Sequence, residues 1–104
     1  MISYSTKDTL SVILISYSGV NQKMQNITIE NLYQTIGKNV AKYRKAKGLS
    51  QLDLSLQMGY KSVSIVSGAE ICYKGKHFNL EHIVKISQLL EVEFCEFFKP
   101  ISES

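Results

Sequence analysis

Proline is almost absent from this chain of 104 residues, and the one proline, Pro100, stands four positions from the end. Because an interior proline breaks an α-helix, nearly the whole sequence can form helices. Cysteine is also scarce. Cys72 and Cys95 lie 23 positions apart, and together with His77 and His82 they match no common zinc spacing. The sequence therefore predicts no metal site and no cofactor, and we expect reduced thiols in a cytoplasmic, nucleoid-associated protein.

Long apolar runs are missing as well. The apolar stretch at residues 10–15 is too short to span a bilayer, and it lacks the basic start and cleavage site of a signal peptide. We therefore expect no membrane partner. The length fits one domain with one modest core, and 44% hydrophobic with 20% charged residues is typical of a globular chain.

Positive charge gathers in the middle of the chain. Residues 35–78 hold eight basic side chains against Asp53 and Glu70, a net charge of +6, whereas residues 79–104 carry −3 and residues 1–34 carry zero. This asymmetry predicts a basic face for a polyanion and an acidic opposite end. Solvated helix faces that only keep a protein soluble would give the same counts, so charge alone does not decide between the two.

Residues 1–28 differ in character from the rest, because they are rich in serine, threonine, tyrosine and β-branched residues. Residues 9–17 favour a strand. A lone hairpin is marginal in water, so we expect a β-prone arm that packs on the helices or pairs with a second copy. The alternative is a partly disordered extension ahead of Met24. Residues 29–100 are predicted to form the main domain and residues 101–104 a tail.

Helix signals begin at residue 29. Apolar side chains recur every three or four positions through residue 47, which predicts an amphipathic helix that Gly48 ends in the left-handed conformation. Ser50 then caps a second helix, with Asp53 completing a capping box, and Gly59 stops it. The stripe of the first helix consists of Leu32, Ile36, Val40 and Tyr43.

A third helix is expected over residues 62–70. It would bury Val66 and Ala69, and Gly68 lowers its helix propensity by about 1 kcal/mol relative to alanine, so contacts with other segments must hold it. The side chains expected on its exposed face are Val63, Ser64, Ser67 and Gly68.

Two more helices complete the expected domain. Asn79 caps the fourth, and the fifth spans about residues 93–98 and ends before Pro100. The side chains expected to face the core are Leu80, Ile83, Val84, Ile86, Leu89 and Leu90 from the fourth helix, and Phe94, Phe97 and Phe98 from the fifth.

Two short helices joined by a tight glycine turn, at residues 50–70, are what a DNA-binding helix-turn-helix requires. Over about residues 36–98 the chain resembles the phage-repressor-like, or xenobiotic-response-element type, helix-turn-helix family of bacterial transcriptional regulators. The resemblance implies an all-α domain of five helices. It rests on Ile36-Gly37, Arg44–Gln51, Leu54-Ser55, Met58-Gly59, Glu70, Asn79–Glu81, Ile83–Ile86, Leu89-Leu90, Val92 and Phe97-Phe98.

The resemblance also implies roles for individual residues. Arg44 is expected to pair with Glu70 and so to clamp the first helix to the third. Gln51 is expected to meet a phosphate and to steady side chains of the third helix, beside Ser50 and exposed N–H groups that suit a phosphate. Base contacts are expected from Lys61, Ser62, Val63, Ser64 and Ser67, and backbone contacts from Lys74 and Lys76.

The side chains best suited to bidentate base pairing, those of Arg, Asn and Gln, are absent from residues 62–70. We therefore expect DNA shape and bridging water to carry much of the specificity. The chain also departs from the family pattern, because it has one extra residue between Gly59 and Glu70 and carries Phe78 where proline is common.

These patterns predict a sequence-specific regulator that binds double-stranded DNA as a homodimer on an inverted repeat. The dimer contact is expected at residues 93–98 or at the strand of residues 11–16. The alternative is an antitoxin-like module that binds a partner protein and regulates its own expression. An enzyme is not expected, since the sequence offers no paired carboxylates, no nucleophile–base spacing and no glycine-rich phosphate loop.

Overall fold

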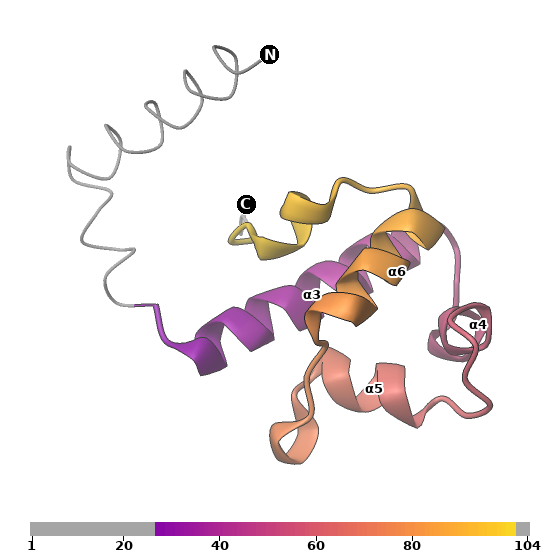
Figure 1. The fold of residues 1–104 in the computed structure, drawn as a ribbon, viewed down its shortest axis with the longest axis horizontal. Helices are drawn as coiled ribbons and strands as arrows, with labels where there is room; N and C mark the ends of the chain where they lie inside the picture. Colours follow the sequence, from indigo (N-terminus) through magenta and orange to yellow (C-terminus); the bar gives the residue numbers. More distant parts are fainter. Residues whose placement is uncertain (1–26, 102–104) are drawn as a thin grey trace, which may run out of the picture.

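A computed structural model describes residues 27–101, and within this range the chain forms four α-helices and two short 3-10 helices, without strands (Figure 1). The all-α expectation is confirmed for these residues. The β-prone arm expected at residues 1–28 lies almost entirely outside them. The elements are α3 (Ile29–Ala46), α4 (Gln51–Gln57), α5 (Ser64–Glu70), η2 (Tyr73–Gly75), α6 (Leu80–Leu90) and η3 (Phe94–Phe98).

Helix α3 is the long element on which the others are assembled. Thr28 caps its start by accepting a hydrogen bond from the Asn31 N–H at 3.1 Å, and Gly48, with φ of +76°, follows its end. Figure 1 shows η3 and α5 on opposite sides of α3, with α6 lying along it. No helix among the described residues is both long and apolar enough to cross a membrane.

One hydrophobic core lies between α3, α4, α5 and α6. Apolar side chains on the helix faces that the sequence predicts form most of this core. Phe78, from the segment before α6, adds a large buried ring. The buried apolar side chains are Ile36, Val40, Leu54, Met58, Val66, Ala69, Phe78, Ile83, Ile86, Leu90 and Phe97.

Part of the expected core faces outward instead. Leu80 and Val84 are 66% and 46% exposed, and Phe94 is 39% exposed. Helix α6 buries a narrow stripe at positions 83, 86 and 90. Val84 lies one position to the side of this stripe, and Leu80 is the first residue of the helix, so both lie beyond the contact. The fifth helix is a 3-10 turn rather than an α-helix.

The segment after α6 is fixed to α3 by a buried asparagine. Both amide hydrogens of Asn39 are used, because its Nδ2 donates to the carbonyl oxygens of Phe97 and Lys99 at 2.8 Å each. Phe97 is fully buried and meets the ring of Tyr43 edge-on at 5.6 Å between centroids. The C-terminal segment is therefore part of the folded unit.

Candidate nucleic-acid interface

Helix α4 begins with the capping box that the sequence predicts. The Ser50 hydroxyl accepts from the Asp53 N–H, and the Asp53 carboxylate accepts from the Ser50 N–H, both at 2.9 Å. The Ser50 backbone N–H, followed by the Ser50 hydroxyl, lowers the pKa of Asp53. A negative charge therefore stands at the start of α4, where a phosphate was expected, and the Ser50 N–H is already used.

A tight turn joins α4 to α5. Gly59 has φ of +98°, and the Tyr60 N–H donates to the Ser55 carbonyl at 3.0 Å. Helix α5 then begins at Ser64 rather than at the expected Ser62. The Ser62 hydroxyl lies 3.0 Å from the Ser64 hydroxyl and accepts from the Ser64 N–H at 3.4 Å, so a local side-chain contact replaces the first helical turn.

Glu70, at the end of α5, joins three helices. Its carboxylate accepts from Arg44 Nε at 2.7 Å and Arg44 Nη2 at 3.1 Å, and from Gln51 Nε2 at 2.8 Å. The structure thus brings together the expected pair of Arg44 and Glu70, with side chains only 7% and 4% exposed. Arg44 Nη1 also donates to the Leu49 carbonyl at 2.7 Å. One N–H of the Gln51 amide remains available to a ligand.

Close approach of α3 and α5 depends on a glycine whose role the sequence reading missed. A Cβ built on Gly37 would lie 2.8 Å from the Ala69 carbonyl oxygen and would collide with the carbonyl oxygen of Glu70. The signal was present in the sequence, because a glycine inside an amphipathic helix pattern marks a close approach of backbones. Gly37 therefore sets the distance at which α5 packs on α3.

The start of α5 is exposed, as expected of a surface that reads DNA. Lys61, Ser62, Val63 and Ser64 are exposed, whereas Ser67 is half-buried and its hydroxyl is directed to the Ser64 carbonyl at 3.5 Å. The structure therefore places four of the five expected base-reading residues together at one end of α5.

Gly68 was expected on the exposed face, and this expectation is wrong. Gly68 is buried because the aliphatic stem of Lys76 lies against it, with Lys76 Cδ only 2.6 Å from the position of a Cβ. Because Gly68 has no side chain, there is space for the stem of Lys76 to pack against α5. This tertiary contact compensates for the low helix propensity of glycine.

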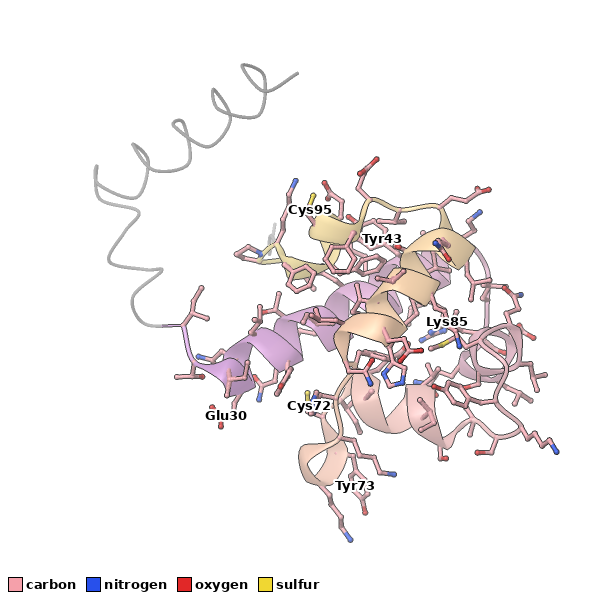
Figure 2. All side chains as sticks on the ribbon, viewed as in Figure 1. Glu30, Tyr43, Cys72, Tyr73, Lys85 and Cys95 are labelled. Atoms are coloured by element: carbon pink, nitrogen blue, oxygen red, sulfur yellow. The ribbon has the colours of Figure 1, made fainter. Side chains whose placement is uncertain are left out.

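The loop that carries Lys74 and Lys76 is held beside α5 in an uncommon conformation. Cys72 and Lys74 have positive φ of 55° and 50°, which costs a non-glycine residue about 1–2 kcal/mol. The ring of His77 stacks on Tyr33 of α3 at 3.7 Å between centroids. Tyr73, which the sequence reading missed, lies at the tip of the loop (Figure 2). The Nζ atoms of Lys74 and Lys76 lie 5.4 Å and 6.0 Å from its ring centroid.

A second capping box links α6 to the turn before α5. Asn79 accepts from the His82 N–H at 2.8 Å, and the Asn79 N–H donates to His82 Nδ1 at 3.0 Å. The neutral ring therefore carries its proton on Nε2, which lies 3.0 Å from the Tyr60 hydroxyl. Burial lowers the pKa of His82, Lys85 and His77 add to the effect, and Glu81 opposes it.

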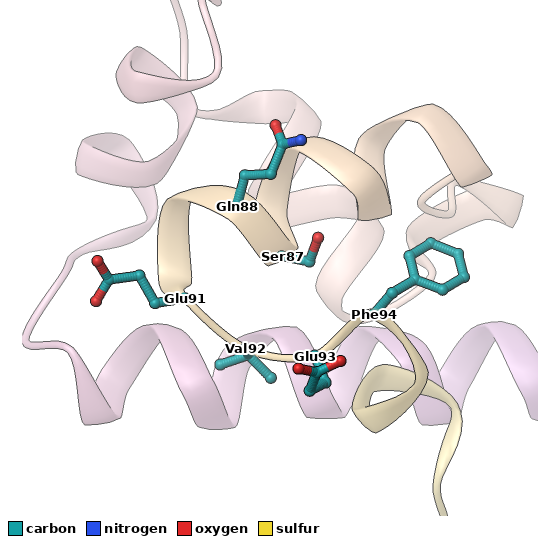
Figure 3. A pocket seen from close by; sticks show the side chains of 6 residues that line it. All are labelled: Ser87, Gln88, Glu91, Val92, Glu93 and Phe94. Carbon is teal, nitrogen blue, oxygen red and sulfur yellow. The ribbon is translucent and has the colours of Figure 1, made fainter. Parts of the chain in front are cut away.

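A separate hollow lies at the C-terminal end of α6, and its side chains diverge from one another (Figure 3). Glu91 is paired with Lys47 Nζ at 2.8 Å, and Phe94 points away from it. Divergent groups of this kind do not form a catalytic constellation. Residues 27–101 also contain no cluster of three or more potential metal ligands.

No family model matches the sequence, and no curated protein matches it. The fold is similar to the crystal structure of the hypothetical transcription factor NHTF from Neisseria, with 27% sequence identity and a TM-score of 0.59. The match covers 71% of this chain and 82% of the Neisseria protein. Residues 27–101 therefore have a transcription-factor-like, all-helical fold.

Proposed function

We propose that this protein is a sequence-specific, DNA-binding transcriptional regulator of the phage-repressor-like type, and that it binds an inverted-repeat operator as a homodimer. Helix α5 enters the major groove with its first residues toward the bases. The observation that carries the proposal is the exposed start of α5, flanked by lysines, on a helix whose other end is anchored through Glu70.

The charges around α5 support this assignment. Lys61 precedes the helix, and Lys74 and Lys76 follow it on a loop that packs against it. A helix of only seven residues is not stable alone. Its contacts with α3 and α4 keep it folded and fix its orientation. The similarity to the Neisseria transcription factor points to the same class of protein.

Each residue has a role in the proposed complex. Lys61, Ser62, Val63 and Ser64 face base edges, where serine hydroxyls donate or accept and Val63 contacts a thymine methyl group. Ser67 lies at the margin of this surface. Lys74 and Lys76 neutralise phosphates, and the remaining amide N–H of Gln51 and the hydroxyl of Ser50 donate to phosphate oxygens.

Selection of bound fragments from a random duplex library tests the proposal. We expect an enriched inverted repeat, and we expect the mass of the complex to correspond to two protein chains on one duplex. The matched control is a variant in which Val63 and Ser64 are both replaced by aspartate. These side chains are exposed, so the fold survives while the reading surface is lost.

Failure to enrich any sequence, with binding that is indifferent to both sequence and salt, would overturn the proposal. Co-purification of a small partner protein that masks α5 would instead favour the antitoxin-like function.

A further inference from the structure

An apolar groove lies beside the N-terminal half of α3, where the C-terminal segment crosses it. It consists of two adjoining hollows of about 490 Å³ and 300 Å³ that share Leu32 and Phe98. Ile27 and Pro100 line the larger hollow, and Ile29 and Leu80 line the smaller one. Because the hollows adjoin at Leu32 and Phe98, we treat them together and call them the arm groove.

The walls of the arm groove are apolar and exposed to solvent. Ile27, Ile29 and Leu80 are 49%, 53% and 66% exposed. Within the described residues, Lys99 is the one lysine, arginine or acidic side chain along its walls, and its Nζ atom is paired with Glu96 at 2.7 Å. Contiguous exposed apolar surface of this kind marks a binding site.

We propose that the arm groove binds residues 10–15 of the same chain. This stretch contains five apolar side chains and no charge, namely Leu10, Val12, Ile13, Leu14 and Ile15 around Ser11. Burying such a run against an apolar wall stabilises it by about 25 cal/mol for each Å² of apolar surface removed from water. The composition of the stretch thus matches that of the groove.

The tether also favours this occupant. Ile27 is itself part of the groove wall, and only the eleven residues 16–26 separate it from Ile15. A chain of that length extends at most about 36–40 Å, so the apolar run reaches every part of the groove. Covalent attachment places the run at an effective concentration of about millimolar, which a second copy of the protein does not reach in dilute solution.

Occupation of the arm groove leaves the proposed DNA-binding surface open. Figure 2 shows Cys95, which lines the groove, on the opposite side of α3 from Tyr73 beside α5. The inference therefore involves neither α5 nor the lysines, and its test does not require DNA. It does occupy residues 93–98 and 11–16, the two segments expected to form a dimer contact, so the dimer would then need another surface.

Cys95 provides a built-in reporter, because it lines the arm groove and is exposed. The test uses the full chain carrying Cys72→Ser, so that Cys95 is the single thiol. The measurement is the rate of Cys95 alkylation by a maleimide. The apolar run is disrupted by Ile13→Asp with Ile15→Asp, and the matched control is Ser16→Asp with Ser18→Asp, which adds the same charge outside the run.

We expect Cys95 of the parent and of the control to react about tenfold or more slowly than Cys95 of the disrupted variant, because a covered thiol reacts only after local opening. Equal, fast alkylation of all three proteins overturns the proposal. Protection that increases with protein concentration also overturns it, since a second copy would then fill the groove.

A cross-linking experiment keeps the inference testable without disrupting the apolar run. In the Cys72→Ser background, the Ser11→Cys variant is expected to form an intramolecular disulfide with Cys95 under mild oxidation, at the mass of a single chain. The matched control, Ser5→Cys, lies outside the run and is expected to link more slowly. A disulfide forms only when the two Cα atoms come within about 7 Å. Equal rates for the two variants contradict a specific contact, because an unbound arm would bring positions 5 and 11 to Cys95 with similar frequency.

Discussion

Glu70 is the residue through which α3, α4 and α5 are joined, and its environment explains why charge is tolerated inside this small core. Both carboxylate oxygens accept hydrogen bonds, from Arg44 and from Gln51. A buried ion pair contributes less to stability than its Coulomb attraction alone would give, since both charges lose hydration. Its main effect here is geometric, because it fixes the end of α5.

Replacing Glu70 with alanine should lower the free energy of unfolding by about 3–5 kcal/mol, because Arg44 is left buried without its partner. Urea unfolding followed by circular dichroism measures this change. The control is Lys47→Ala, which breaks the exposed pair with Glu91 and should change stability little, because solvent screens this pair. Equal losses in the two variants would contradict the structural role assigned to Glu70.

Lys76 has two parts with separate roles, a stem that packs on Gly68 and an ammonium group that is proposed to neutralise phosphate. Lys76→Met keeps most of the stem and removes the charge. We expect DNA affinity to fall by a similar factor for all sequences and, in a dimer, the slope of log affinity against log salt to decrease by about two. Gel shifts at several salt concentrations measure both quantities. Lys99→Met, on the far side of α3, should leave the slope unchanged.

At the scale of elements, α5 is a short helix held by its neighbours. A Gly37→Ala substitution forces α3 and α5 apart, and such overpacking typically costs about 1–3 kcal/mol. The variant should also lose operator affinity at temperatures where it remains folded, because the angle of α5 changes. Thermal unfolding with parallel gel shifts checks both effects, and Gln34→Ala, at an exposed site on α3, is the control.

The cap of α6 should make stability depend on pH. Burial holds the pKa of His82 below its ordinary value of 6.5, so the unfolded chain takes up this proton first as the pH falls. The stabilisation from neutral His82 is fully present above about pH 6.5 and is lost as the pH drops through the folded-state pKa. Protonation also removes the acceptor for the Asn79 N–H.

Urea unfolding at several pH values between about 5 and 7.5 measures this dependence around the ordinary histidine pKa. In the His82→Gln variant, which keeps a capping acceptor without a titrating ring, the decline should be smaller. An identical decline in both proteins would assign the effect to other groups.

The elements that could be predicted from the sequence are those with local causes. Ser50 with Asp53, Asn79 and Gly48 mark helix ends through contacts within four residues, so their positions follow from the order of side chains. The burial of Gly68 could not be predicted in this way, because it depends on Lys76 from another segment. The outward position of Leu80 likewise depends on the rotation of α6 about its own axis relative to α3. Helical periodicity alone does not fix this rotation.

At the scale of the whole molecule, Tyr73 on the lysine-bearing loop and α5 lie on one side of α3, and Cys95 in the larger hollow of the arm groove lies on the other (Figure 2). With Lys61, Lys74 and Lys76 from each of two copies in contact with phosphates, the slope of log affinity against log salt should be about −5. A titration on the selected operator measures it. A slope near zero would contradict the proposed dimeric contact.

The seven residues of α5 also limit how much of an operator one chain can read. The helix is about 10 Å long, which is the rise of about three base pairs. A sequence of about three base pairs occurs by chance throughout any genome, so one chain bound through α5 alone would not select a specific site. Under the proposed function, specificity would therefore come from two half-sites of an inverted repeat together with the spacing between them.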